Sequence, residues 1–448
     1  MPPFSDPPHK EEPSAAHADD ARRYRPSWLL FMPFLGRPPA LTRRQWSVLG
    51  LVASASFFEQ YDVYLFVLTL KQIQAGLQIP EAQLGLLGAV VRFGSLPAFL
   101  ILVFADRIGR RRVLLFTIAA YTLLTAATAF APDVRTFVIL QFLARAFAVA
   151  ESLLGIVVIA EEFDPAVRGW GIGALGAIQS CGAGLAALLF ALIGGYENGW
   201  RALYLIGLGP LLILAYYRRR MPETERFVAH QRQRELHPEP QLLFAPLKEL
   251  FRRYPRRFAL LAVVVFIFAA AAAVADFFAS KYLQDVHGWT PRGVGLLTVF
   301  AGAFAVVGNT FAGWLSDRIG RKRVTVGFLF AEAICAVAYY NAPSFLIVPL
   351  WLLMIFTLLG TGVMLAAYGA ELFPTSYRST AAGARVAIAT VGASLGLLLE
   401  SLLFHSFGSH WPAISLLASL TLITPLIVAF TFPETSGRPL EEIAPERR

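Results

Sequence analysis

The stretch FADRIGRRR, Phe104–Arg112, separates two long apolar runs, and the rest of the chain is organised around it. Six of its nine residues are Asp, Arg or Gly, which is typical of a short basic hairpin on the cytoplasmic side of a membrane. A second stretch, WLSDRIGRKR, Trp314–Arg323, repeats the pattern, and its Asp317 follows Asp106 by 211 positions. A charged hairpin that recurs half a chain later predicts a protein built from two copies of one unit.

The composition indicates a membrane protein with many spans. The chain has 448 residues, is 56% hydrophobic and 15% charged, and has a mean hydropathy of +0.57, whereas a soluble domain carries about 25% charge. Apolar runs near 20 residues can cross ~30 Å of hydrocarbon as helices, and helices satisfy their own backbone groups in lipid. The runs predict twelve spans, at 46–70, 82–105, 113–131, 136–160, 170–193, 201–217, 258–282, 293–315, 324–340, 345–369, 380–404 and 412–432.

The predicted fold class is therefore an all-α membrane protein, with twelve transmembrane helices in two pseudo-symmetric six-helix bundles. We expect a disordered tail over 1–44, a first bundle over 45–217 and a linker over 218–257. A second bundle over 258–432 and a tail over 433–448 follow. An even number of spans places both termini on one side of the membrane.

The basic residues are concentrated in every second loop, on one side of the predicted membrane. Of the 39 Lys and Arg residues, 31 lie in the tails, the linker and the loops on the hairpin side, five lie in the other loops, and three lie inside spans. The positive-inside rule then predicts cytoplasmic termini and hairpins, in a cell (inner or plasma) membrane. The formal net charge of +9 reflects this topology, so no nucleic-acid partner is expected.

Two further motif pairs support a duplication. PETERF begins at Pro222 and PETSGRPLEE at Pro433, again 211 positions apart, while EEFDPAVRG (161–169) corresponds to ELFPTSYRS (371–379). With the hairpins, these motifs resemble those of the major facilitator superfamily, and within it the sugar porters and related metabolite–proton symporters. The sugar porters also carry a double-Gln motif in span 7, whereas this chain reads AAAVADFFASKYLQ there.

The resemblance implies two bundles around a central cavity that opens alternately to either side, with the substrate near the membrane midplane. It also implies that the hairpin and loop charges help to gate the cavity, with Asp106 and Asp317 pairing with basic groups and helix ends across the bundle interface. The residues expected in this gating role are Asp106, Arg107, Gly109, Arg110, Glu162, Arg168, Asp317, Arg318, Gly320, Arg321, Glu371 and Arg378.

Charged residues inside the spans need a partner or a purpose, because each costs about 2.5–3.5 kcal/mol at the membrane centre. Glu59 and Asp62 share one face of span 1, and Arg145 in span 4 is expected at a similar depth. In proton-coupled sugar porters an Asp in span 1 and an Arg in span 4 form the pair that couples transport to the proton. Asp62 and Arg145 occupy similar places in this chain, so the resemblance implies the same role. We expect Asp62 to carry the proton, with Glu59 tuning it or carrying the proton itself. The alternative is a static pair that fixes helix packing.

Candidate substrate-binding residues are Arg92, Arg145, Glu151 and Gln179. Arg92 could bind an anionic substrate or neutralise a span 1 carboxylate, and Gln179 corresponds to a substrate-binding Gln of the sugar porters. Glu332 in span 9 has no evident partner, and a histidine relay is not expected because His405 and His410 flank the last outer loop. We expect no metal, no cofactor and no enzymatic chemistry.

The sequence therefore predicts a secondary active transporter, a proton-coupled symporter of an organic acid. An organic acid is favoured over a sugar because Arg92 and Arg145 could face the cavity and the span 7 sugar motif is missing. A sugar or polyol symporter is the alternative, and a non-transporting nutrient sensor on the same fold is the alternative of another class. The expected partners are the small-molecule substrate, protons and the lipid bilayer, and the chain is expected to function as a monomer.

Overall fold

A computed structural model describes residues 35, 38–219, 245–437 and 440–444, and within these ranges it contains helices and no strands. The first half contains α2 (Arg43–Leu68), α3 (Leu70–Leu77), η3 (Glu81–Gln83), α4 (Leu84–Phe93), α5 (Pro97–Ile108), α6 (Arg110–Thr128), α7 (Val134–Glu162), α8 (Pro165–Ile193), α9 (Gly199–Ile206) and α10 (Leu208–Arg218). The second half contains α12 (Ala245–Arg253), α13 (Pro255–Asp285), α14 (Pro291–Ile319), α15 (Arg321–Tyr339), η4 (Ser344–Leu346), α16 (Ile347–Glu371), η5 (Thr375–Tyr377), α17 (Arg378–Phe407), α18 (His410–Leu420), α19 (Ile423–Thr431) and α20 (Leu440–Ile443).

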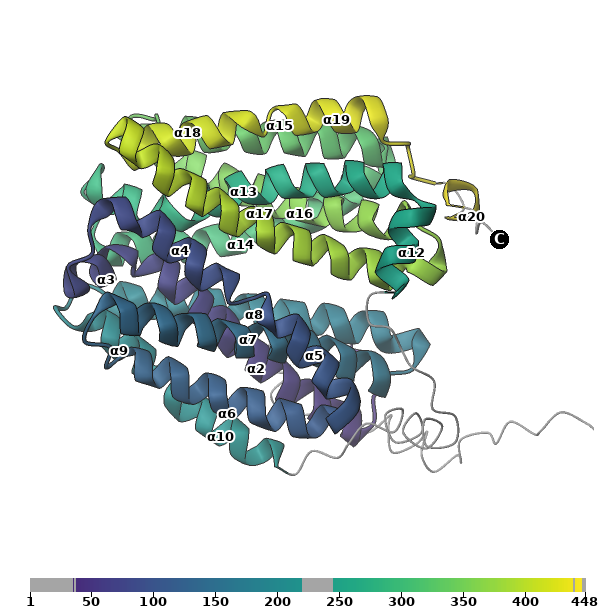
Figure 1. Cartoon of the computed structure of the whole chain (residues 1–448), viewed down its shortest axis with the longest axis horizontal. Coiled ribbons are helices and arrows are strands. Elements are labelled where there is room, and N and C mark those ends of the chain that lie inside the picture. The colour runs from purple at the N-terminus through teal and green to yellow at the C-terminus, as the bar shows by residue number, and fades with distance from the viewer. Residues whose placement is uncertain (1–34, 36–37, 220–244, 438–439, 445–448) are drawn as a thin grey trace, which may run out of the picture.

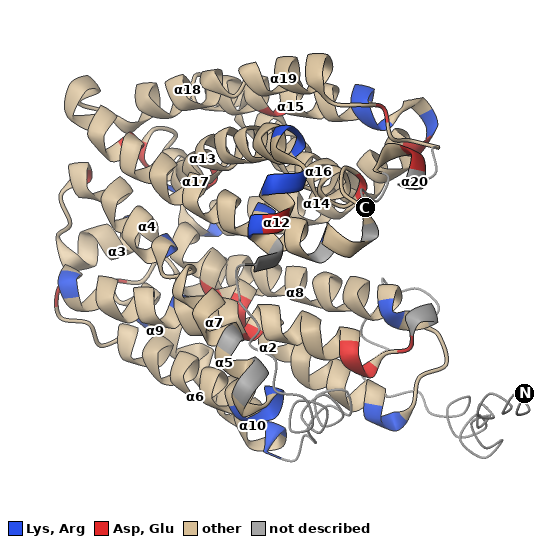
Figure 2. Cartoon of the chain, turned by 45° about the vertical axis from the view of Figure 1, so that its right-hand side comes forward, with Lys and Arg blue, Asp and Glu red and all other residues tan. Residues whose placement is uncertain are grey.

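The two halves form two separate bundles, one above the other in Figure 1. Each bundle provides six membrane-length segments, which confirms the predicted all-α architecture of two six-helix bundles. Nine of these segments in the described chain are both long and apolar enough to cross a membrane, and α2, α6 and α15 complete the two sets of six. Most Lys, Arg, Asp and Glu lie near the helix ends, with only a few along the middle (Figure 2).

Several spans are interrupted where the sequence disfavours a continuous helix. The second span breaks between α4 and α5 at residues 94–96, and Pro97 opens the new helix at a position that needs no N–H donor. The sixth span breaks at Gly207, between α9 and α10. The predicted linker over 218–257 contains helix α12, and residues 220–244 of that linker lie outside the described chain.

The repeated hairpins have the same backbone geometry. Gly109 ends α5 with φ +113° and ψ 145°, and Gly320 ends α14 with φ +108° and ψ 140°. A residue with a side chain is strained at such a positive φ, so glycine is required at both turns. The duplication predicted from sequence is thus present in the fold. We call the end of the bundles with Gly109 and Gly320 the hairpin end.

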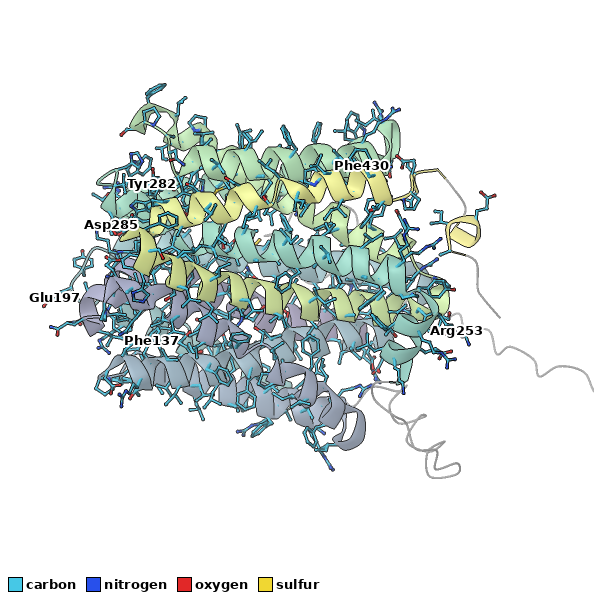
Figure 3. The ribbon with its side chains drawn as sticks, turned by 45° about the horizontal axis from the view of Figure 1, so that its top comes forward. Phe137, Glu197, Arg253, Tyr282, Asp285 and Phe430 are labelled. Carbon is cyan, nitrogen blue, oxygen red and sulfur yellow. The ribbon has the colours of Figure 1, made fainter. Side chains whose placement is uncertain are left out.

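The other end of the bundles, which we call the latch end, is where the two halves are joined by hydrogen bonds. Ser280 Oγ of α13 donates to the Leu68 carbonyl of α2 at 2.9 Å, and Ser401 Oγ of α17 donates to the Ala82 carbonyl at 2.8 Å. Figure 3 shows Tyr282, Asp285 and Glu197 at this end, with Arg253 at the hairpin end.

Candidate functional site

A cavity lies between the two bundles and contains about 630 Å³ of space free of atoms, including the part open to solvent. This is within the range of small-molecule binding sites. Apolar and aromatic side chains such as Phe66 and Phe277 form much of its wall. Five charged side chains also line it: Glu59 and Asp62 from α2, Arg92 from α4, Arg145 from α7 and Asp276 from α13. The sequence analysis singled out four of them, Glu59, Asp62, Arg92 and Arg145, as charges inside the spans.

Asp62 is held by uncharged groups. Its Oδ2 accepts hydrogen bonds from the Tyr121 hydroxyl and, at 3.2 Å, from Thr125 Oγ1, both on α6. Its Oδ1 is buried and has no hydrogen-bond partner among the described residues. Asp62 forms no ion pair within the part of the chain that the structure describes. It is therefore a buried carboxyl group that lines the same cavity as two arginines but is paired with neither of them to stabilise its charged form.

The predicted Asp62–Arg145 ion pair is not formed, which corrects the sequence-based expectation. Both side chains line the same cavity, but Arg145 Nε donates to Ser95 Oγ at 3.0 Å, and the charge of Arg145 acts on Glu59 instead. Glu59 is 5% exposed, and its Oε2 accepts from Gln179 Nε2 at 2.7 Å. The matching depths on two helices did not specify which of two neighbouring carboxylates faces the arginine.

Arg92 and Asp276 face the cavity from opposite bundles. They interact electrostatically, yet neither side chain forms a hydrogen bond or an ion pair in the described part of the chain. Arg92 is half-buried and lines the cavity. Its guanidinium donors have no hydrogen-bond acceptor among the described residues. A guanidinium in this state can bind a carboxylate through two parallel hydrogen bonds.

Glu151 does not belong to the cavity, although it was expected among the substrate-binding residues. It is 2% exposed and forms an ion pair with Arg218 of α10, which is 1% exposed. Thr117 Oγ1 donates to the second carboxylate oxygen at 2.6 Å, and Arg218 Nη2 donates to the Leu51 carbonyl at 3.1 Å. This cluster ties α6, α7, α10 and α2 together. Gln179, which the resemblance to the sugar porters suggested as a substrate-binding residue, does not line the cavity but donates to Glu59, which does.

The gating residues form ion pairs within each bundle at the hairpin end. Arg110 pairs with Glu161 at 3.1 Å, and Arg321 pairs with Glu371 at 2.7 Å, so the duplication extends to these contacts. Glu162 pairs with Arg44 at 2.8 Å. The side chains of Asp106 and Arg107 lie outside the described residues.

Asp317 does not pair across the bundle interface as expected. It contacts Arg321 of its own hairpin at 3.3 Å, and its side chain is 70% exposed. Arg318 lies over the Trp314 ring at 4.2 Å, while Arg168 and Arg378 each bury an Nε without a partner in the described chain. None of the gating residues whose side chains the structure describes lines the cavity.

A buried charge cluster at the latch end was missed by sequence reasoning. His410, Glu400 and Glu81 form a chain of hydrogen bonds between the two bundles. The available signal was Glu400, a carboxylate inside span 11 that was not considered, ten residues before a histidine. Glu332, for which no partner was predicted, is 2% exposed with its Oε2 unpartnered among the described residues.

Comparison with known proteins decides the family. The model of the Major Facilitator Superfamily matches residues 52–293 and 261–447, which together span both bundles. The chain belongs to the major facilitator superfamily. This confirms the resemblance noted from the hairpin motifs, and the superfamily's members are transporters, not enzymes.

Several relatives are named after the compound that they transport. The chain is 25% identical to the niacin transporter NiaP of Acinetobacter baylyi, with 76% of this chain and 82% of the relative covered. It is 23% identical to the benzoate transport protein of Acinetobacter baylyi (87% and 90% covered) and 27% identical to the citrate–proton symporter of Salmonella typhi (81% and 85% covered). These similarities support a transporter of a small metabolite.

Solved structures show the same fold. A crystal structure of a D-xylose–proton symporter matches with a TM-score of 0.72 and 18% identity, covering 88% of this chain and 99% of that one. The xylose transporter XylE from E. coli in an inward-open conformation matches with a TM-score of 0.69 and 18% identity, covering 89% and 99%. At this identity the likeness concerns the fold alone.

Proposed function

We propose that this major facilitator protein is a proton-coupled symporter of a small organic acid. The observation that carries the proposal is that one cavity contains both an arginine and a carboxyl group without a charged hydrogen-bonding partner, Arg92 and Asp62. The arginine suits the carboxylate of a substrate, and the carboxyl group suits a proton. Loading one carboxylate together with one proton adds no net charge to the cavity, whereas loading the carboxylate alone would add a negative charge that is costly in a low-dielectric interior.

An organic acid fits the cavity better than a sugar. A sugar presents hydroxyl groups on all sides and needs many neutral hydrogen-bonding partners, whereas the walls here are mostly apolar and the polar groups mostly charged. Phe66 of one bundle meets Phe277 of the other at 5.4 Å in an edge-to-face arrangement, which provides a surface for a flat or apolar substrate body. The names of the niacin, benzoate and citrate relatives agree with an acid.

Asp62 is the proton carrier in this proposal. Burying a carboxylate without a cation costs free energy that protonation removes, and Asp62 is in that situation whereas Glu59 has Gln179 as a donor and Arg145 as a nearby charge. The positive charge of Arg145 favours the charged form of Glu59. Asp62 is then the one carboxyl group of α2 in the cavity that takes up a proton. Protonation of Asp62 would weaken its bonds to Tyr121 and Thr125 and so change the contact between α2 and α6.

We also propose that the hairpin end faces the cytoplasm, because 31 of the 39 basic residues lie on that side. The protein then resides in the cell membrane with both termini inside and functions as a monomer. The latch end is closed in this structure by hydrogen bonds between the two halves. The paired Arg110–Glu161 and Arg321–Glu371 contacts would hold the helix ends of each bundle while the bundles rock.

The test uses purified protein in liposomes with an imposed pH gradient, acid outside. We expect labelled benzoate, nicotinate or citrate to accumulate, and labelled xylose not to. The variant Arg92→Gln should lose binding of the transported acid by at least tenfold, while Arg135→Gln, an exposed arginine on the first turn of α7, should not. Accumulation of xylose but of no acid, or an Arg92→Gln protein with unchanged acid affinity, would reject the organic-acid proposal.

A further inference from the structure

His410 is buried at the latch end, between two carboxylates from different bundles. Its Nδ1 lies 2.6 Å from Glu400 Oε1 of α17, and its Nε2 lies 3.0 Å from Glu81 Oε2 of η3. The side chain is 4% exposed, and the ring is stacked on Phe278 at 4.4 Å and contacts Phe404 at 4.5 Å. The ring therefore cannot turn away from either carboxylate without disturbing α13 and α17.

The charges around Glu81 determine how the ring nitrogens are used. Lys281 Nζ of α13 donates to Glu81 Oε1 at 3.1 Å, and the Glu81 side chain is 48% exposed, so Glu81 is ionised and can only accept. His410 Nε2 must then carry a proton and donate a hydrogen bond to Glu81. This leaves Nδ1 and Glu400 Oε1 facing each other at 2.6 Å.

That short contact requires one proton of its own. If His410 is an imidazolium, Nδ1 donates to an ionised Glu400, and if His410 is neutral, a protonated Glu400 donates to Nδ1. With no proton, two lone pairs would face each other at 2.6 Å in a site where Glu400 is 0% exposed and its Oε2 has no partner among the described residues. An unmade hydrogen bond between buried groups costs about 1–3 kcal/mol, and more for charged ones.

The pair is part of the contact between the bundles. Glu81 and Gln74 of the first half hold Lys281, and Lys71 of α3 pairs with Asp285 of α13 at 2.7 Å. The α4 backbone at Gly85 lies directly against Glu400 and the Leu397 carbonyl, so a methyl group there would collide with both. His410 and Glu400 thus lie at the point where α4 and η3 of one bundle contact α17 and α18 of the other.

We infer that the His410–Glu400 pair is a second proton-binding site, separate from the cavity, and that the latch end closes only while the pair holds one proton. Loss of that proton leaves two acceptors opposed inside the closed interface and shifts the protein towards separation of the bundles at this end. The site concerns the equilibrium between conformations and does not depend on which solute is carried.

The other titratable groups near the pair are accounted for. Glu81 and Lys281 face it from η3 and α13, and Asp285 lies behind Lys281, which donates to it at 2.6 Å. Tyr340, which directly follows α15, interacts electrostatically with Glu400, but its hydroxyl donates to the Ala275 carbonyl. Of the groups facing the pair, Glu81 and Lys281 form an ion pair and Tyr340 is engaged with the backbone, so the proton that is gained or lost belongs to His410 and Glu400.

The test measures the separation of the bundles at the latch end without any solute. Spin labels replace Arg135 on α7 and Phe345 on η4, both exposed and in different bundles, in a chain whose Cys181 and Cys335 are alanine. Distances are measured in lipid nanodiscs from pH 5 to pH 9. The key variant is Glu400→Gln, since its amide can donate to a neutral Nδ1 and make the closed contact without the titrating proton. His405→Gln, an exposed histidine at the end of α17, is the matched control.

We expect the ratio of separated to closed protein to rise with pH in the wild type, through a transition of up to tenfold per pH unit that Glu400→Gln lacks. His405→Gln should follow the wild type. Equal pH dependence in the wild type and Glu400→Gln, or no pH dependence in the wild type, would overturn the inference. Because no solute is added, these outcomes are distinct from a failure of the organic-acid proposal, which is tested by accumulation.

Discussion

The buried ion pair of Glu151 with Arg218 allows a sharp test, because sequence and structure assign Glu151 different roles. At a substrate site, Glu151→Gln would change substrate affinity and leave stability alone. In the observed cluster, it leaves the Arg218 guanidinium buried at 1% exposure with no counter-charge. Breaking one side of a buried pair costs about 3–5 kcal/mol.

The expected shift in melting temperature follows from the size of the chain. At roughly 2.1 cal/mol/K per residue, the unfolding entropy of a 448-residue chain makes 1 kcal/mol equal to about 1 °C. Glu151→Gln should therefore melt about 3–5 °C below the wild type in a fluorescence-monitored thermal scan in detergent. The double variant Glu151→Leu with Arg218→Met should recover most of the loss, because it leaves no unpaired charge.

Substrate affinity is measured on the same samples. We expect the dissociation constant of the transported acid for Glu151→Gln to stay within about twofold of the wild type, since Glu151 does not line the cavity. A protein with unchanged melting temperature and much weaker substrate binding would show that the Glu151–Arg218 contact is not the stabilising cluster described, and would return Glu151 to the substrate site.

Two further predictions concern the hairpin end. Gly109→Ala and Gly320→Ala should each lower stability by about 1 kcal/mol or more, because both glycines have a positive φ, whereas Gly313→Ala, with open space around its Cα, should be neutral in the same thermal scan. Burial raises the pKa of Glu434, but hydrogen bonds from four backbone N–H groups outweigh it and hold that pKa below its ordinary value. The stabilisation by Glu434 is therefore fully present above the unfolded-state pKa near 4.3 and is lost as the pH falls through the folded-state value. The melting temperatures of wild type and Glu434→Gln should differ at pH 7 and converge at low pH; a gap that persists at low pH would contradict this sign.

The architecture could be predicted from sequence because its signals are long and repeated. Apolar runs of membrane length gave the spans, and the repeat of Asp106 at Asp317 gave the two halves. The cavity charges were also predictable as a set, since Glu59, Asp62, Arg92 and Arg145 are each anomalous in an apolar helix. What failed was the assignment of partners, because a contact between helices depends on rotation and tilt that periodicity within one helix does not contain.

Two cases show how partners were missed. Arg218 was counted among the basic residues that set topology at the end of span 6, yet its side chain folds back into the bundle and pairs with Glu151. His410 was set aside because it flanks the last outer loop, yet α18 packs on α17 and α17 packs on α4 and η3, which buries His410 between Glu81 and Glu400. Both residues lie at helix ends, where only the tertiary arrangement decides whether a charge faces water or protein.

The central claim is that solute transport moves protons through Asp62, and solute-driven proton flux tests it most directly. Liposomes containing the protein and an internal pH-sensitive dye receive the transported acid outside, with no initial pH gradient. We expect the wild type and Asp133→Asn, an exposed capping residue of α7, to acidify the lumen as solute enters. Asp62→Asn should show no acidification but still exchange labelled for unlabelled solute. Acidification by Asp62→Asn at the wild-type ratio of protons to solute would contradict the assignment of Asp62 as the proton carrier.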